Sequence, residues 1–145
     1  MAAFLHRGMS RRSLKSAAAR LALAAVFISS MAQAHHSYAM FDGSKKLEVS
    51  GTVARLEWKN PHVYLWVYVP KPGARGEYDL WAFENGSPSA LSARGWTRQS
   101  LKAGERLTVD YWPLRDGSRG GHLGRLTWAD GRELAGVGGP GTGRF

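Results

Sequence analysis

After residue 46 the chain alternates apolar and polar residues over several short segments, the pattern of half-buried β-strands. The alternation is interrupted once, because the apolar phase of Val49, Gly51 and Val53 moves by one residue to reach Leu56 and Trp58. Such a slip after a glycine predicts a bulge or a sharp bend in the first strand. The pattern as a whole predicts strands at residues 47–58, 63–69, 77–83, 106–112 and 123–128.

One short helix is expected between the third and fourth strands. Ser87 suits an N-cap, Pro88 suits the first helical position, and Gly95 suits the residue after the helix end. A glycine-rich loop at residues 115–121 is expected before the last strand. The Asp-Gly pair at residues 130–131 then predicts a tight turn into a small terminal hairpin.

The order of three strands, a short helix and two strands is that of the OB-fold, a five-stranded, partly open barrel. We therefore expect an all-β protein, a small OB-like five-stranded barrel with one short helix between strands 3 and 4. Another small barrel or sandwich with the same number of strands is the alternative. The domain is expected to cover residues 35–135, and a flexible tail with five glycines is expected at residues 136–145.

The first 34 residues have the layout of a cleavable bacterial signal peptide. Basic residues at 11–15 are followed by an apolar run at 21–28 and by Ala32-Gln33-Ala34, so cleavage is expected before His35. The apolar run is much shorter than the roughly 20 residues that a spanning helix needs. Residues 10–15 match a twin-arginine signal in part, and the general secretory route is the expected one. We therefore expect a periplasmic or secreted protein that is not an integral membrane protein after cleavage.

Composition narrows the possible chemistry further. The chain has no cysteine, which excludes disulfides, thiolate metal sites and cysteine nucleophiles. Five of the 20 basic residues lie in residues 1–34, so 15 basic residues remain against 11 acidic ones. This mild excess does not indicate a nucleic-acid partner. Because no nucleophile turn, zinc-protease helix or phosphate loop is present, no catalytic residue is predicted and an enzyme is not expected.

Four histidines follow the expected cleavage site: His35, His36, His62 and His122. Cleavage would leave His35 at the N-terminus, where its amine and its imidazole can chelate one metal ion together. A further histidine would complete a set of three nitrogens, which favours Cu(II), and the same ligands also accept zinc. His62 is expected in the loop after the first strand and His122 at the end of the loop before the last one, and these loops flank one surface of an OB-fold. The sequence therefore predicts a copper site formed by His35, His36, His62 and His122.

Plainer explanations of the same residues stay open. Histidines in a mobile tail need bind nothing, and His62 can bond a backbone group in its own turn. Glu57 and Glu84 are placed where they could face the same cavity as His62, although their spacing does not require it.

Aromatic residues on the predicted strands offer a second kind of surface. In an OB-fold such residues can stack on a ligand, which would make the protein a non-enzymatic binding module for an envelope protein or a small ligand. The interpretation favoured here is that they pack into the core, because the strands are apolar on both faces. The residues concerned are Tyr64, Trp66, Tyr68, Trp81 and Trp112.

Several different short motifs are spread over nearly all of the chain after residue 34. They are His-His-Ser-Tyr-Ala-Met-Phe-Asp at 35–42, Trp-Lys-Asn-Pro-His at 58–62, Arg-Gly-Trp at 94–96, Pro-Leu-Arg-Asp-Gly at 113–117 and Gly-Gly at 120–121. In these motifs the chain resembles a family of short exported proteins of Gram-negative bacteria that are classed together as a domain of unknown function. The resemblance implies that the opening His-His-Ser and the Asn-Pro-His turn are signatures of that family, and it implies no activity.

Overall fold

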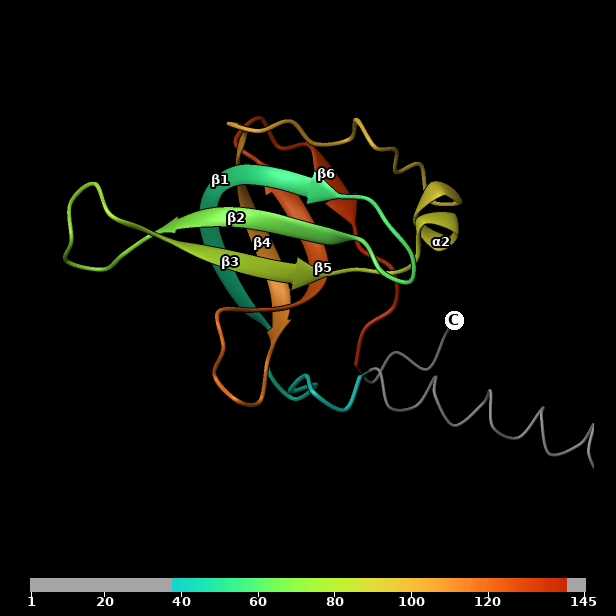
Figure 1. The fold of residues 1–145 in the computed structure, drawn as a ribbon, viewed down its shortest axis with the longest axis horizontal. Helices are drawn as coiled ribbons and strands as arrows, with labels where there is room; N and C mark the ends of the chain where they lie inside the picture. Colours follow the sequence, from blue (N-terminus) through green and yellow to red (C-terminus); the bar gives the residue numbers. More distant parts are fainter. Residues whose placement is uncertain (1–37, 141–145) are drawn as a thin grey trace, which may run out of the picture. The chain divides into compact units, whose positions relative to one another are not determined.

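In the computed structural model, residues 38–140 are described, and they form six β-strands and one short α-helix. Figure 1 shows a barrel with the β2–β3 hairpin loop projecting at one end and the helix α2 near the other. The elements are β1 (Leu47–Glu57), β2 (Tyr64–Pro70), β3 (Tyr78–Glu84), α2 (Pro88–Ser92), β4 (Arg106–Pro113), β5 (Gly120–Trp128) and β6 (Glu133–Ala135).

The barrel closes because β3 pairs with two different strands. The sheet runs in the order β3-β2-β1-β4-β5-β6, and β3 also pairs in parallel with β5. The prediction of an OB-like five-stranded barrel with one short helix between strands 3 and 4 is therefore confirmed. Strand β6 pairs with β5 as the small terminal hairpin that the Asp-Gly pair predicts.

Strand β1 is long because it serves two neighbours. Its first half, up to Thr52, pairs with β4, and the half from Thr52 to Glu57 pairs with β2. The register against β2 shifts between Val53 and Arg55, which confirms the predicted bulge. A bulge bends a strand and increases its twist, so one strand can pass from one side of the barrel to the other.

Helix α2 begins as the sequence predicts. The Ser87 hydroxyl accepts a hydrogen bond from Ala90 N at 3.3 Å, and Pro88 takes the first turn. The helix and the turn after it add the fully buried Leu91 and Trp96 to the core, and Trp96 Nε1 donates to the Ala135 carbonyl at 2.8 Å. No helix within residues 38–140 is long and apolar enough to cross a membrane.

Strand β5 begins at Gly120, so residues 120–121 do not belong to the loop that the glycine-rich sequence predicts. Gly120 has a φ of +141°, and a Cβ added there would overlap the carbonyl oxygen of Ala82. A Cβ at Gly121 would overlap the carbonyl oxygen of Trp112. Glycine therefore permits the close approach of β5 to both neighbours rather than marking a loop. As a correction, His122 lies inside β5 and not at a loop end.

Residues 136–140, which the sequence assigns to the glycine-rich tail, contact the barrel. The Gly136 N–H donates to the Gly124 carbonyl at 2.9 Å, and the Val137 N–H donates to Asn85 Oδ1 at 2.9 Å. The ordered chain therefore continues past residue 135, and this segment forms part of the site described next. Residues 141–145 lie outside the described residues.

Candidate functional site

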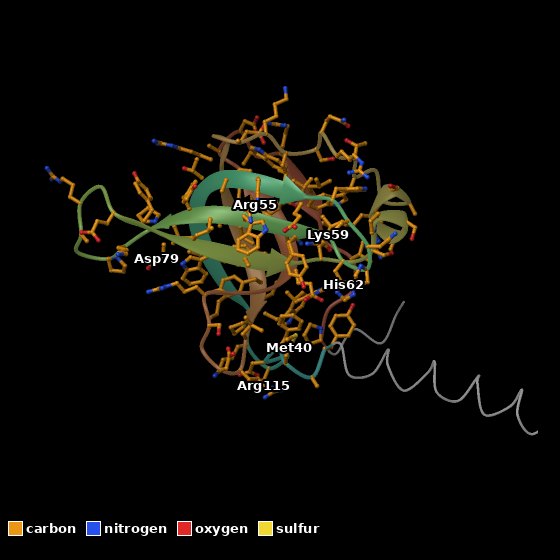
Figure 2. All side chains as sticks on the ribbon, in the orientation of Figure 1. Met40, Arg55, Lys59, His62, Asp79 and Arg115 are labelled. Atoms are coloured by element: carbon orange, nitrogen blue, oxygen red, sulfur yellow. The ribbon has the colours of Figure 1, made fainter. Side chains whose placement is uncertain are left out.

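His62 and His122 come together at the end of the barrel where β3 ends and β5 begins. Glu84, the last residue of β3, is the register partner of His122 in β5. The Val63 N–H donates to the Gly86 carbonyl, and the Val63 carbonyl accepts from the Asn85 N–H. These two bonds fasten the chain next to His62 to the residues just after β3 and so hold His62 beside Glu84. Figure 2 shows His62 at the opposite end from Asp79, which lies at the start of β3.

The Glu84 carboxylate is shared by His62 and Tyr64. His62 Nδ1 lies 2.8 Å from one carboxylate oxygen, and the Tyr64 hydroxyl donates to the other at 2.8 Å. Burial and this bond raise the pKa of Tyr64 to about 12, and burial followed by the charge of Glu84 also raises the pKa of Tyr38. Because a carboxylate only accepts, the proton of a neutral His62 ring sits on Nδ1, and Nε2 keeps its lone pair.

The His122 ring is buried, with 1% of the residue exposed. Its Nε2 donates to the Val137 carbonyl at 3.1 Å, and its Nδ1 has no hydrogen-bond partner in the part of the chain that the structure describes. Burial lowers the pKa of His122 to about 4; hydrogen bonding to the backbone of Val137 and of Gly138 opposes this change, and the nearby charge of His62 adds to it. At neutral pH the ring is therefore uncharged, and Nδ1 carries an unpaired lone pair.

Aromatic rings from the start of the described chain enclose His122. Tyr38 contacts the imidazole edge-on, with centroids 5.1 Å apart and planes at 82°, and Phe41 lies 5.4 Å away. The segment is fixed to the end of β4, where the Asp42 N–H donates to the Pro113 carbonyl at 2.8 Å. The chain just after the predicted His-His pair is thus held against the buried histidine.

Asn85 positions the acceptor that orients His122. This side chain is buried, and its Oδ1 accepts from Val137 N at 2.9 Å and from Gly86 N at 2.8 Å. The Val137 carbonyl is thereby held where His122 Nε2 can donate to it. The segment that contains Val137 therefore fixes the tautomer of the buried ring.

The structure brings together two of the four predicted ligands, His62 and His122, while His35 and His36 lie outside the described residues together with the expected signal peptide. Within residues 38–140, no group of three or more His, Asp or Glu side chains is arranged to hold a metal ion. Of the two carboxylates weighed beside His62, Glu84 does contact it, whereas Glu57 bonds Lys59 and Trp66 instead.

Sequence reasoning missed three components of the site: Tyr38, Tyr64 and the Val137 carbonyl. The alternation along β2 does place Tyr64 on the face away from Leu65, so its outward position could have been read from the pattern. The contacts of Tyr38 and Val137 depend on packing between distant segments, for which the sequence carries no local signal.

The favoured placement of the aromatic residues in the core is wrong for part of the set. Trp81 packs against the core, but Tyr68 is 47% exposed. Leu65, Val67 and Val69 occupy the inner face of β2, so the alternating tyrosines and Trp66 point outward. Trp66 is covered instead by Arg55, whose guanidinium lies 4.3 Å from the ring centroid.

Comparison with known proteins identifies the family and nothing more specific. No curated protein matches the chain, and no solved structure matches it. Residues 22–123, which include every strand from β1 to β4 and His62 and His122, match a family of unknown function, and the chain therefore belongs to that family, DUF6152.

Proposed function

We propose that the protein is an exported metal-binding accessory protein that holds one copper ion at the His62–His122 end of the barrel. The observation that carries the proposal is the buried Nδ1 atom of His122, which has no hydrogen-bond partner within residues 38–140. Buried polar atoms are paired in the large majority of cases, and an unpaired one in a folded protein points to a water or an ion.

Both histidines also have the second partner that metal-binding histidines need. Such a histidine donates one ring N–H to a carboxylate or a backbone carbonyl, which fixes the ring and leaves the other nitrogen for the metal. His62 has Glu84 in this role, and His122 has the Val137 carbonyl. Metal binding requires neutral imidazole, and the lowered pKa keeps His122 neutral at physiological pH.

The remaining ligands of the proposed site come from the N-terminal histidines. Tyr38, which contacts the His122 ring, follows His35 by three residues. A chain of that length spans at most about 10 Å, and in the proposed site His35 and His36 would lie within that distance of Tyr38. Removal of a signal peptide after Ala34 and release into the periplasm are part of the proposal, because a free amine on His35 would then supply one more nitrogen.

Copper is the metal that this ligand set favours. Imidazole and amine nitrogens without thiolate or several carboxylates suit Cu(II), which also stands at the head of the affinity order of divalent metals. Zinc accepts the same nitrogens and is the competitor that any experiment must include.

The test is a titration with Cu(II) of protein exported and processed in a bacterial periplasm, with its N-terminus at His35 verified by mass spectrometry. We expect one copper per chain and an electron paramagnetic resonance spectrum with nitrogen ligands. One added residue before His35, or His62→Asn, should weaken copper binding by about tenfold or more. Titration with Zn(II) under the same conditions measures selectivity.

Trp66→Ala is the matched control, because Trp66 lies on the outer face of β2, where its indole N–H donates to Glu57 and its ring packs under Arg55. Its copper affinity should equal that of the unaltered protein. Weak binding that is equal in the processed, extended and His62→Asn proteins would refute the copper site.

The second candidate function is a binding module that uses the outer face of β2. The exposed Tyr68 and the Trp66 ring beneath Arg55 favour it, because aromatic side chains held on a barrel face are a common recognition surface. Its ligand would be an envelope protein or a small molecule, and its binding would be insensitive to an added N-terminal residue.

A further inference from the structure

A pocket lies along the paired strands β1 and β4, beside the start of β3 and the end of β5. There the structure has a slot of about 440 Å³, lined by residues of β1, β4 and the end of β5 and by Pro70 and Tyr78 of the β2–β3 hairpin. Trp128 is six residues along β5 from His122, a separation of about 20 Å along a strand. The slot is therefore distinct from the histidine site.

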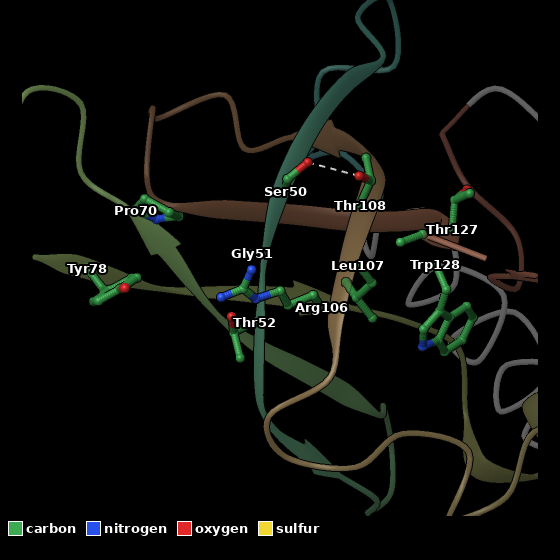
Figure 3. A pocket seen from close by; sticks show the side chains of 11 residues that line it. Ser50, Gly51, Thr52, Pro70, Tyr78, Arg106, Leu107, Thr108, Thr127 and Trp128 are labelled. Atoms are coloured by element: carbon green, nitrogen blue, oxygen red, sulfur yellow. Dashed lines mark hydrogen bonds between the residues drawn. The ribbon is translucent and has the colours of Figure 1, made fainter. Parts of the chain in front are cut away.

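The walls of the slot combine apolar surface with hydroxyl groups. Leu107, Trp128 and Tyr78 supply the apolar surface, and Ser50 and Thr108 face each other across β1 and β4 with their hydroxyl oxygens 2.9 Å apart. Figure 3 shows these residues around the slot, with Trp128 and Tyr78 on opposite sides of it. A volume of this size is within the range of small-molecule sites, which are mostly apolar with a few polar groups.

Arg106 carries the only charge among the residues that line the slot. Its backbone pairs with Thr52 of β1, and Figure 3 shows its guanidinium crossing β1 beside Gly51. Within residues 38–140 the Arg106 side chain has no ion pair and no hydrogen bond. By contrast, Lys71, Arg119 and Arg125 each pair with a carboxylate.

We propose that this slot binds a small organic monocarboxylate with a flat apolar body, which Arg106 recognises. Arg106 is exposed at the start of β4, and its guanidinium fork matches a carboxylate in two parallel hydrogen bonds. No carboxylate lines the slot to compete for Arg106. Pro70 and Tyr78 on one side of the slot and Trp128 on the other give apolar surface for the body of such a ligand, although one part of the Trp128 ring is covered by Arg132, whose guanidinium lies 4.9 Å from the ring centroid.

The test uses 2-naphthoate as the probe, together with the neutral 2-naphthamide of the same shape. Binding is followed by amide and indole N–H shifts in two-dimensional NMR spectra of the isotopically labelled, processed protein. We expect 2-naphthoate to shift signals of Thr108, Thr127 and Trp128 but not those of His62 and His122. Arg106→Gln should weaken 2-naphthoate binding by about tenfold or more, the loss expected for a charge-assisted hydrogen bond, and should leave 2-naphthamide binding unchanged.

Arg94→Gln is the matched control, because Arg94 is exposed beyond the end of α2 and its side chain likewise has no partner within residues 38–140. It should bind 2-naphthoate as the unaltered protein does. The proposal is overturned if 2-naphthoate does not bind at millimolar concentration, if its shifts lie elsewhere, or if Arg106→Gln and Arg94→Gln behave alike. Binding of naphthoate and naphthamide with equal affinity would overturn the role of Arg106.

Discussion

Gly120→Ala is expected to lower the free energy of unfolding by about 4 kcal/mol, because the added methyl group makes the backbone conformation unfavourable and also overlaps a neighbouring strand. The φ of +141° at this position is one that residues with a side chain rarely adopt. The new Cβ would also overlap the Ala82 carbonyl, at the point where β5 pairs with β3 and closes the barrel. Relief of the overlap requires β3 and β5 to separate, and relief of the φ penalty requires the backbone of residue 120 to rotate out of its place in β5.

Urea unfolding followed by tryptophan fluorescence measures this loss. Gly117→Ala is the control, because Gly117 has a φ of +78° but a Cβ there would meet no atom within 4 Å. That variant should lose only about 1 kcal/mol, the cost of a positive φ alone. Equal losses in the two variants would show that the β3–β5 approach is looser than described.

The fold could be predicted largely because its signals are local. The alternation of apolar and polar residues predicted where the strands lie, and the shift of that alternation after Gly51 predicted the bulge beyond Val53. Ser87 and Pro88 predicted the start of the helix. These features depend on neighbouring residues and on backbone preferences. The start of β5 was missed because Gly120 normally indicates a loop, whereas here glycine allows two backbones to approach.

The histidine site could be predicted only in outline. Loop positions in an OB-fold suggested that His62 and His122 share one end of the barrel, and they do. The partners that orient the rings, Glu84 and the Val137 carbonyl, follow from the register of β3 against β5 and from the docking of residues 136–140. These are contacts between segments far apart in the chain, and a single sequence does not encode them as a local pattern.

The burial of His122 should make the stability of the metal-free protein depend on pH. The pKa of His122 is about 4 in the folded protein and 6.5 in an ordinary histidine, so the unfolded chain binds more protons between these values. The contribution of the neutral His122 ring to the free energy of unfolding is therefore complete above pH 6.5, and it is lost as the pH falls from 6.5 to about 4. The full loss amounts to about 3 kcal/mol in the free energy of unfolding.

His122→Gln isolates this contribution, because the glutamine amide can still donate to the Val137 carbonyl but does not titrate. Urea unfolding in the presence of a chelator, at a series of pH values from 7.5 to 4.5, should give a steep loss of stability for the unaltered protein and a flatter one for the variant. The titration of Asp42 does not mimic this difference between the two profiles, because the pKa of Asp42 is lowered to about 2 and its contribution is lost at lower pH in both proteins. Parallel pH profiles would mean that His122 accepts a proton in the folded state as readily as in the unfolded chain. In that case water reaches the ring, and the unpaired Nδ1 atom would no longer argue for a metal ion.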